Sequence, residues 1–401
     1  MAGGLNLIAV EEAQERALRL ASPLAGENVP LAKCSGRWLT DDIVAQRAQP
    51  WADLSAMDGY ALRHADLTGP LAIIGESITG GPLPPPLAPG AACRIFTGAP
   101  LPLGADTVVI QEDTAIASDG RLTLASETGP QRMGQNVRPA GSDFSEGQVL
   151  LSHGQCLGPQ HIALAAVGGY GALPVGGMPR IALISTGSEL VAPGQAVRAD
   201  QLPSSNAVML ETMLGRLPCR VDDFGIIPDD LDQLVAAFGR TRGHDIIVTT
   251  GGASVGDHDL VRPAFMAAGG TLDFWKVAMR PGKPLMVGRI GDAILLGLPG
   301  NPVSAFTTAL LFLLPIARRL AGSPVPLPAL VDMTVTTGLP AGGDRQTYVR
   351  GHREGAVVTP LVDQDSAGLV ALAQANCLIV RPSHAAPAPA GSTHPVLPLD
   401  Y

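Results

Sequence analysis

Short apolar segments alternate with amphipathic segments between about residues 180 and 320 of this 401-residue chain. The apolar segments, which we expect to be strands, are at 181–184, 221–227, 245–249, 274–278 and 293–296. The amphipathic segments, which we expect to be helices, are at 206–217, 229–238 and 259–268, with another opening at Asn301. Continuous apolar strands alternating with helices are typical of an open, mostly parallel sheet covered on both faces. The sequence therefore predicts an α/β domain in this region.

The regions on either side of the α/β region have a different sequence pattern, with short segments that favour β-strands. Residues 50 to about 139 contain short β-prone pieces separated by glycine and proline, including the proline-rich run 80–86, which can only be a surface loop. After residue 326, strand candidates at 331–337, 347–350, 357–361 and 376–380 follow one another at short spacing, as in a small barrel or sandwich. An amphipathic helix is expected over residues 11–20. A chain of this length is expected to form roughly two to four domains.

Composition excludes several classes of function. The net charge of −9 argues against a general nucleic-acid surface, which needs clustered Lys and Arg. The apolar run 305–314 is too short to cross a membrane and ends at Pro315, and the N-terminal residues show no export signal. The five cysteines are scattered and never form a C-x-x-C pair, which favours free thiols in a reducing compartment over a zinc site. We therefore expect a cytoplasmic protein that binds neither nucleic acid nor membrane.

One glycine-rich loop in the α/β region combines two kinds of side chain. Gly251, Gly252 and Gly256 would let backbone N–H groups approach an anion closely. Asp257 and Asp259 would repel that anion unless a cation lay between them, and Mg²⁺ commonly bridges carboxylates and phosphates. The alternative is a solvent-facing turn with an aspartate as helix N-cap, and this loop alone does not decide between the two.

Three loops leave the carboxyl ends of expected strands, and ligands of open α/β sheets bind outside those ends. The first loop carries Glu189 and the second is the glycine-rich loop. In the third, Asn301 is a suitable N-cap and Pro302 suits a first helical turn. Three basic residues lie in a nearby strand and turn: Lys276, Arg280 and Lys283. They either line an anion site with these loops or form a solvated face, and the convergence of the loops favours a site.

Seven short segments together resemble the molybdopterin molybdenumtransferase (MoeA) family, which includes the C-terminal domain of gephyrin. They occur in the family's order along nearly the whole chain. The segments are 55–61, 95–106, 134–143, 185–189, 249–259, 276–284 and 297–304. Each segment alone is a weak match, but seven in the same order are specific.

The resemblance implies a multidomain α/β protein that forms an elongated homodimer. The implied domains are a discontinuous linking domain (1–45 and 140–177), a β-rich domain (46–139), an open, mostly parallel α/β molybdopterin-binding domain (178–326) and a C-terminal β-barrel (327–401). The active site would be shared between the α/β domain of one subunit and the β-rich domain of the other. Transient contacts with the molybdopterin adenylyltransferase and with molybdoenzyme chaperones are also implied.

The resemblance also implies a reaction: adenylylated molybdopterin and molybdate yield molybdenum cofactor and AMP, with Mg²⁺ required, in the last common step of that cofactor's biosynthesis. The catalytic positions carried over by motif are Asp58, Thr97, Asp143, Glu189, Asp229 and Asp259, of which Glu189 and Asp259 would hold the metal. The substrate-binding positions are Gly251, Gly252, Ser254, Gly256, Lys276, Arg280, Lys283, Pro299, Asn301, Pro302, Arg350 and Ser366.

The chain departs from the family pattern at three positions. Ser188 stands where an acid commonly precedes the glutamate, Arg280 replaces a common lysine, and Ser205 replaces the acid that usually precedes Asn206.

Two other functions are alternatives to the transferase. One is the related adenylyltransferase, which shares the α/β domain but lacks the flanking β regions and the motif around Asp58. The other is a non-catalytic scaffold, against which the retained carboxylates argue.

Overall fold

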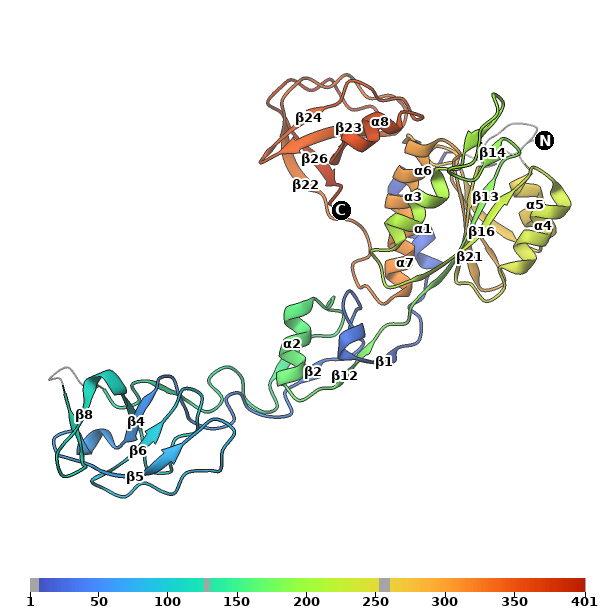
Figure 1. The fold of residues 1–401 in the computed structure, drawn as a ribbon. Coiled ribbons are helices and arrows are strands. Elements are labelled where there is room, and N and C mark those ends of the chain that lie inside the picture. Colours follow the sequence, from blue (N-terminus) through green and yellow to red (C-terminus); the bar gives the residue numbers. More distant parts are fainter. Residues whose placement is uncertain (1–6, 126–129, 131, 252–259, 401) are drawn as a thin grey trace.

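The computed structural model describes residues 7–125, 130, 132–251 and 260–400. The chain is elongated, and Figure 1 shows a β-rich unit at one end and an α/β unit towards the other, with a small linking unit between them. The C-terminal barrel lies beside the α/β unit, away from the β-rich end. The multidomain architecture expected from the sequence is confirmed.

The α/β unit contains a six-stranded sheet in the order β16-β13-β17-β21-β20-β18. Its parallel strands are β13 (Arg180–Thr186), β16 (Arg220–Ile227), β17 (Ile246–Thr250) and β21 (Ala293–Leu298). Two antiparallel strands, β20 (Met286–Ile290) and β18 (Thr271–Trp275), complete one edge. The predicted open, mostly parallel sheet is therefore confirmed. Strand β20 was not predicted; it forms a hairpin with β21 through the two-residue turn Gly291-Asp292, in which Gly291 has a positive φ.

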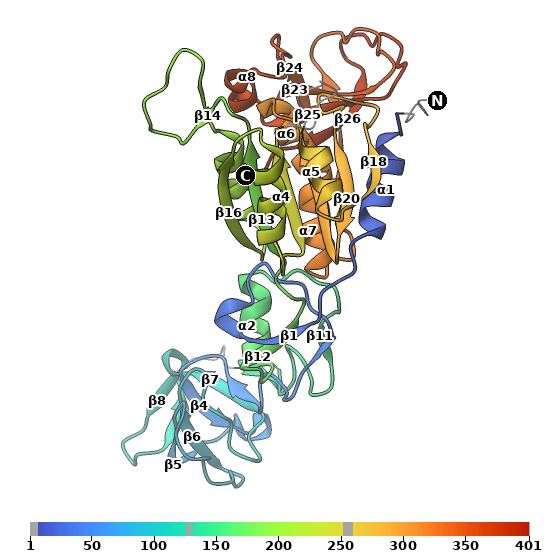
Figure 2. The same ribbon diagram turned by 90° about the vertical axis from the view of Figure 1, so that its right-hand side faces the viewer.

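Helices cover both faces of this sheet, as Figure 2 shows for the face that carries α4 and α5. That face holds α4 (Leu231–Arg240) and α5 (Val261–Ala267), whose buried residues include Phe238 and Phe265. The opposite face holds α1 (Val10–Arg19), α3 (Asn206–Leu214), α6 (Pro302–Thr308), a π-helical turn (Ala309–Leu313) and α7 (Leu314–Leu320). The continuous helix Pro302–Leu320 is long and apolar enough to cross a membrane, but 89% of its most apolar 18-residue stretch is buried inside the structure, as in a core helix.

The linking unit joins segments that are far apart in the sequence. Strand β1 (Glu27–Pro30) pairs with β12 (Ala172–Val175), and β2 (Ile43–Val44) pairs with β11 (Val149–Leu151). Helix α2 (Pro159–Val167) packs beside β11, and a 3₁₀ turn (Leu31–Lys33) follows β1. Helix α1, although it precedes β1 in the chain, contributes its buried residues to the core of the α/β unit.

The β-rich unit is built on a four-stranded sheet in the order β5-β6-β4-β7. These strands are β4 (Gly59–Leu62), β5 (Ala72–Ser77), β6 (Ala91–Ile95) and β7 (Thr107–Ile110). Two small pairs flank the sheet: β3 (Leu54–Ser55) with β10 (Val137–Arg138), and β8 (Thr114–Ile116) with β9 (Leu122–Leu124). Single 3₁₀ turns occur at His64–Asp66 and Gln111–Asp113.

The C-terminal unit is a closed five-stranded barrel, which confirms the predicted β-barrel. Its strands are β22 (Val331–Val335), β23 (Gln346–Glu354), β24 (Val357–Pro360), β25 (Cys377–Arg381) and β26 (Thr393–Pro398), with the short helix α8 (Leu369–Gln374). The barrel closes because β23 pairs with both β24 and β25. Strand β19 (Met279–Arg280) of the α/β unit also pairs with β23, which holds the two units together.

Candidate active site

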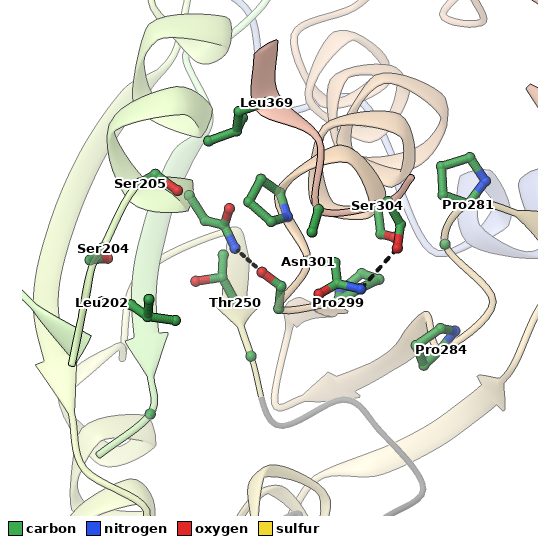
Figure 3. A pocket seen from close by; sticks show the side chains of 18 of the residues that line it. Leu202, Ser204, Ser205, Thr250, Pro281, Pro284, Pro299, Asn301, Ser304 and Leu369 are labelled. Atoms are coloured by element: carbon green, nitrogen blue, oxygen red, sulfur yellow. Dashed lines mark hydrogen bonds between the residues drawn. The ribbon is translucent and has the colours of Figure 1, made fainter. Parts of the chain in front are cut away.

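A cavity of about 1330 Å³ opens where the parallel strands end and the barrel begins. Residues at the ends of β13, β17 and β21 line it, together with the turn after β19 and a barrel segment that includes residues 364–367. Figure 3 shows Leu202, Ser204 and Ser205 on one side of this cavity and Pro281 and Pro284 on the opposite side. The predicted convergence of loops at the carboxyl edge of the sheet therefore produces a single cavity.

The loop after β13 is tied to the loop after β16. The backbone N–H of Ser188 donates to Oδ2 of Asp229 at 3.1 Å, and the N–H of Asp229 donates to Oγ of Ser188 at 3.1 Å. Glu189 folds back against Gly187, where a Cβ would lie 2.7 Å from its Oε2. Glu189 and Asp229 both line the cavity, so its wall carries a carboxylate beside each of two neighbouring strand ends.

The second loop begins at Gly251, which needs to be glycine. Its φ is +97°, and a Cβ added there would collide with the carbonyl oxygen of Thr186. Gly251 thus lets the end of β17 pass close to the end of β13 at the cavity wall. The predicted site residues Gly252, Ser254, Gly256 and Asp259 lie outside the described residues, so Glu189 is the described member of the predicted metal pair.

The third loop, between β21 and α6, contacts the barrel. Asn301 stands at the predicted N-cap position of α6, but its side chain donates from Nδ2 to Oγ of Ser366 at 3.0 Å and makes no capping bond. The N–H of Val303 donates to the carbonyl oxygen of Ser366 at 3.1 Å. Pro299, Pro302 and Ser366 all line the cavity with Asn301. The barrel is therefore docked on this loop by the segment that carries Ser366.

Two of the predicted basic residues, Arg280 and Lys283, line the cavity. The barrel adds a third cation, Arg345, which sequence reasoning missed because its approach depends on the pairing of β19 with β23. Lys276 is not a lining residue; its φ is +79° and its Nζ lies 4.1 Å from the centre of the Trp275 ring.

Arg350 is not among the lining residues either; its side chain is buried between β23 and the segment 363–368. It donates from Nη1 to the Gly368 carbonyl at 3.2 Å and from Nη2 to the Asp363 carbonyl at 2.9 Å. Burial lowers the pKa of its guanidinium, with Asp363 and Asp365 opposing that shift. In this structure Arg350 shapes the segment that presents Ser366.

Four further lining residues were not assigned to the site from the sequence, although each lies within or beside a segment or position named there. Asp365 and Gln364 come from the barrel, and Asn206 and Ser304 from helices α3 and α6. The described wall therefore carries three acids (Glu189, Asp229 and Asp365) and three bases (Arg280, Lys283 and Arg345). In the sequence, the signal that could have identified such lining residues is an acidic or hydroxyl side chain close to the end of an expected strand.

The remaining predicted residues lie towards the other end of the chain. Asp58 precedes β4 and Thr97 follows β6, in the β-rich unit that Figure 1 places far from β13. Oδ1 of Asp58 accepts hydrogen bonds from the Thr97 N–H at 2.7 Å and Oγ1 at 2.8 Å, and these bonds lower the pKa of Asp58. Asp143 lies in the connection to the linking unit, where its N–H donates to the Gln49 carbonyl. Within one chain, Asp58, Thr97 and Asp143 therefore do not line the cavity.

The cavity can supply oxygen ligands for a magnesium ion. No group of three or more His, Cys, Asp or Glu side chains suited to a metal occurs among the described residues. Mg²⁺, however, is usually held by only one or two carboxylates together with substrate phosphates and water. Glu189 and Asp229 provide two such carboxylates, so the residues present fit that ion.

Comparisons with known proteins agree with this architecture. The chain matches the MoeA N-terminal region (domains I and II) at residues 8–169, the probable molybdopterin-binding domain at 182–319 and the MoeA C-terminal region (domain IV) at 332–399. It is similar to the molybdopterin molybdenumtransferase of Haemophilus influenzae, with 31% identity over 98% of this chain and 99% of that protein. It is also 35% identical to molybdopterin molybdenumtransferase 2 of Mycobacterium tuberculosis over 82% of this chain and 85% of that protein.

Solved structures show the same fold. A molybdopterin biosynthesis MoeA protein from Pyrococcus horikoshii aligns with a TM-score of 0.84 and 26% identity, covering 99% of this chain and 100% of that one. A second structure from that organism gives a TM-score of 0.81 with 25% identity, covering 98% of this chain and 100% of that one. Because the similarity spans all parts of the chain, including the barrel and the β-rich unit, this chain belongs to the MoeA family of molybdopterin molybdenumtransferases.

Proposed function

We propose that this protein transfers molybdenum from molybdate to adenylylated molybdopterin and releases AMP. The observation that carries the proposal is the single cavity in which Glu189 and Asp229 lie together with three cations, Arg280, Lys283 and Arg345, in a chain of this family. The volume of about 1330 Å³ leaves room for a nucleotide-sized ligand and a second, small anion.

Both proposed substrates are anionic, so their encounter needs positive charge. Two unit charges ~4 Å apart repel by about 4 kcal/mol at an effective dielectric of 20. Arg280 at the end of β19 and Lys283 in the turn that follows are exposed and line the cavity, and Arg345 lines it from the barrel. These side chains would bind and orient the anionic groups and offset part of the repulsion between them.

We include Mg²⁺ in the proposed reaction. Glu189 and Asp229 would hold it, together with Asp259, which lies outside the described residues. When bound, the ion would polarise the phosphoryl oxygen at the pyrophosphate bridge and stabilise the departing AMP. The hydrogen bonds between Ser188 and Asp229 would keep the Asp229 carboxylate in place while the substrate binds.

We further infer that the active protein is a homodimer. Asp58 and Thr97 lie at the far end of the elongated chain from the cavity, so in one subunit they cannot act beside Glu189. A second copy would supply its β-rich unit to the cavity, which accounts for two separate groups of family motif residues. We place this reaction in the cytoplasm, with transient contacts to the preceding adenylyltransferase and to molybdoenzyme chaperones.

The test is nucleotide release by the purified protein. With adenylylated molybdopterin, Mg²⁺ and molybdate, we expect AMP to appear in proportion to molybdenum bound to the pterin, and omission of molybdate or Mg²⁺ to suppress it. Glu189→Gln, which removes one charge at constant shape, should strongly reduce release. ATP consumption in the presence of molybdopterin, with no molybdate-dependent AMP release, would instead identify an adenylyltransferase.

A further inference from the structure

Asn206 opens helix α3 and forms part of the cavity wall. The residue is 8% exposed, so almost all of it is packed within the protein. Nδ2 donates a hydrogen bond to the carbonyl oxygen of Gly300 at 2.8 Å. This bond crosses 94 residues of sequence and joins the start of α3 to the loop that contains Pro299 and Asn301.

The bond to Gly300 determines how the side-chain amide of Asn206 is oriented, that is, where its Nδ2 and its Oδ1 lie. Because a carbonyl oxygen can only accept, the group that faces Gly300 has to be the NH₂ group, and Oδ1 points the other way. Oδ1 is buried and has no hydrogen-bond partner within the described part of the chain. A buried acceptor without a donor destabilises a folded protein, so such groups are few in native structures.

The surroundings of Asn206 differ from the basic side of the cavity. Its neighbours in the chain, Ser204 and Ser205, are uncharged, and Figure 3 shows them across the cavity from Pro281 and Pro284, which flank Lys283. Anionic groups of a ligand are drawn towards the basic side. We therefore expect an uncharged part of the ligand to reach Asn206, and that part has to offer a donor if it is to satisfy Oδ1.

We propose that Asn206 is a specificity-determining residue. Its Nδ2 holds the Gly300 peptide in place, and its Oδ1 accepts a hydrogen bond from an N–H or O–H group on the uncharged heterocyclic or sugar part of the substrate. This inference rests on the proposed function for the nature of the substrate. An analogue without the donor would leave Oδ1 of Asn206 buried and unpaired, which is how such sites discriminate against analogues.

Direct binding tests this role without depending on turnover. Calorimetry would compare AMP, molybdopterin and molybdate as separate ligands of the wild type, Asn206→Leu, Asn206→Asp and the control Thr212→Val. Thr212 lies on the exposed side of the same helix and its hydroxyl donates to the Val208 carbonyl at 2.8 Å, so its variant measures general disturbance of α3.

We expect Asn206→Leu to weaken the binding of either AMP or molybdopterin about tenfold, the size of one lost buried hydrogen bond. Which of the two is weakened shows whether the donor belongs to the nucleoside or to the pterin. Molybdate binding and the melting temperature should stay close to those of Thr212→Val. Equal binding of both organic ligands by Asn206→Leu and the wild type overturns the proposal, as does a parallel loss of molybdate binding.

Asn206→Asp provides a second readout that a packing role would not give. An ionised carboxylate cannot donate to the Gly300 carbonyl, whereas a protonated carboxyl can donate there and still accept from the ligand. Affinity of this variant, relative to the wild type at the same pH, should therefore recover as the pH falls. A constant ratio across pH contradicts the assignment. Wild-type binding without AMP release would contradict the proposed reaction alone and leave the Asn206 comparison intact.

Discussion

Asn301 of the α/β unit donates a hydrogen bond from Nδ2 to Oγ of Ser366 in the barrel, across 65 residues of sequence, at 3.0 Å. The same residue, Ser366, accepts the N–H of Val303 through its carbonyl oxygen. Two units that each have their own core are thus joined at the mouth of the cavity. The position of the barrel over the cavity depends on this contact, on the pairing of β19 with β23, and on barrel residues such as Tyr348, Leu378 and Leu397 that pack into the core of the α/β unit.

Ser366→Ala should loosen the barrel at the cavity without unfolding it. The variant loses the bond to Asn301, worth about 1 kcal/mol, but keeps the backbone bond to Val303. We expect faster hydrogen exchange at residues 299–305 and 364–369, with unchanged exchange in β22 to β26. Thr359→Val is the control, because it removes a hydroxyl contact to Thr336 elsewhere on the barrel. Equal exchange in both variants would show that the Asn301 bond does not hold the barrel.

Thr97→Val should raise the pKa of Asp58. Hydrogen bonds from Thr97 hold that pKa below its ordinary value, so the stabilisation is present above the ordinary pKa and is lost as the pH falls through the lowered one. The variant removes the Oγ1 donor and keeps the backbone N–H, so the pKa should move only part of the way back. A carboxyl NMR titration measures it.

Thr79→Val is the matched control for that titration. The Thr79 hydroxyl donates to the Thr97 carbonyl at 3.0 Å and not to Asp58, so its loss should leave the pKa of Asp58 in place. A shift of similar size in both variants would mean that the loop around Thr97, and not its hydroxyl, sets the pKa.

The sequence predicted those parts of the fold that depend on local pattern. Alternating strands and helices identified the α/β unit, because each element has to bury one apolar face. Strand β20 was missed because residues 286–290 follow a turn rich in Pro and Gly and pair within a hairpin. Strand β26 was missed because its prolines, Pro395 and Pro398, are unusual in a strand.

The site shows the same division between local and long-range information. Loops at strand ends were predicted because the parallel sheet collects them at one edge. The approach of Arg345 and Ser366 was not readable locally, since it depends on how the barrel docks on β19 and the Asn301 loop. Nor could the sequence show that Arg350 is buried against the segment 363–368, since those partners depend on how that segment folds over β23.

Gly251→Ala should destabilise the protein more than Gly269→Ala. Both glycines have a similar positive φ, +97° and +89°, so each substitution carries a backbone cost of about 1–2 kcal/mol. A Cβ at position 269 meets open space, whereas one at 251 collides with the Thr186 carbonyl and forces the ends of β13 and β17 apart. Denaturant unfolding measures the difference, and equal stabilities would mean that the loop relaxes freely.

Mixing two inactive variants tests whether the active site is shared. Asp58→Ala removes an acid from the β-rich unit and Glu189→Ala removes one from the cavity, and Figure 1 shows these units far apart in one chain. If the site forms between subunits, a heterodimer of the two variants has one site with both substitutions and one with neither. Co-refolded, differently tagged subunits should therefore regain up to about half of the wild-type AMP release per dimer. Verified heterodimers that stay inactive would place each site within one subunit, and Asp58 would then have no direct part in the reaction.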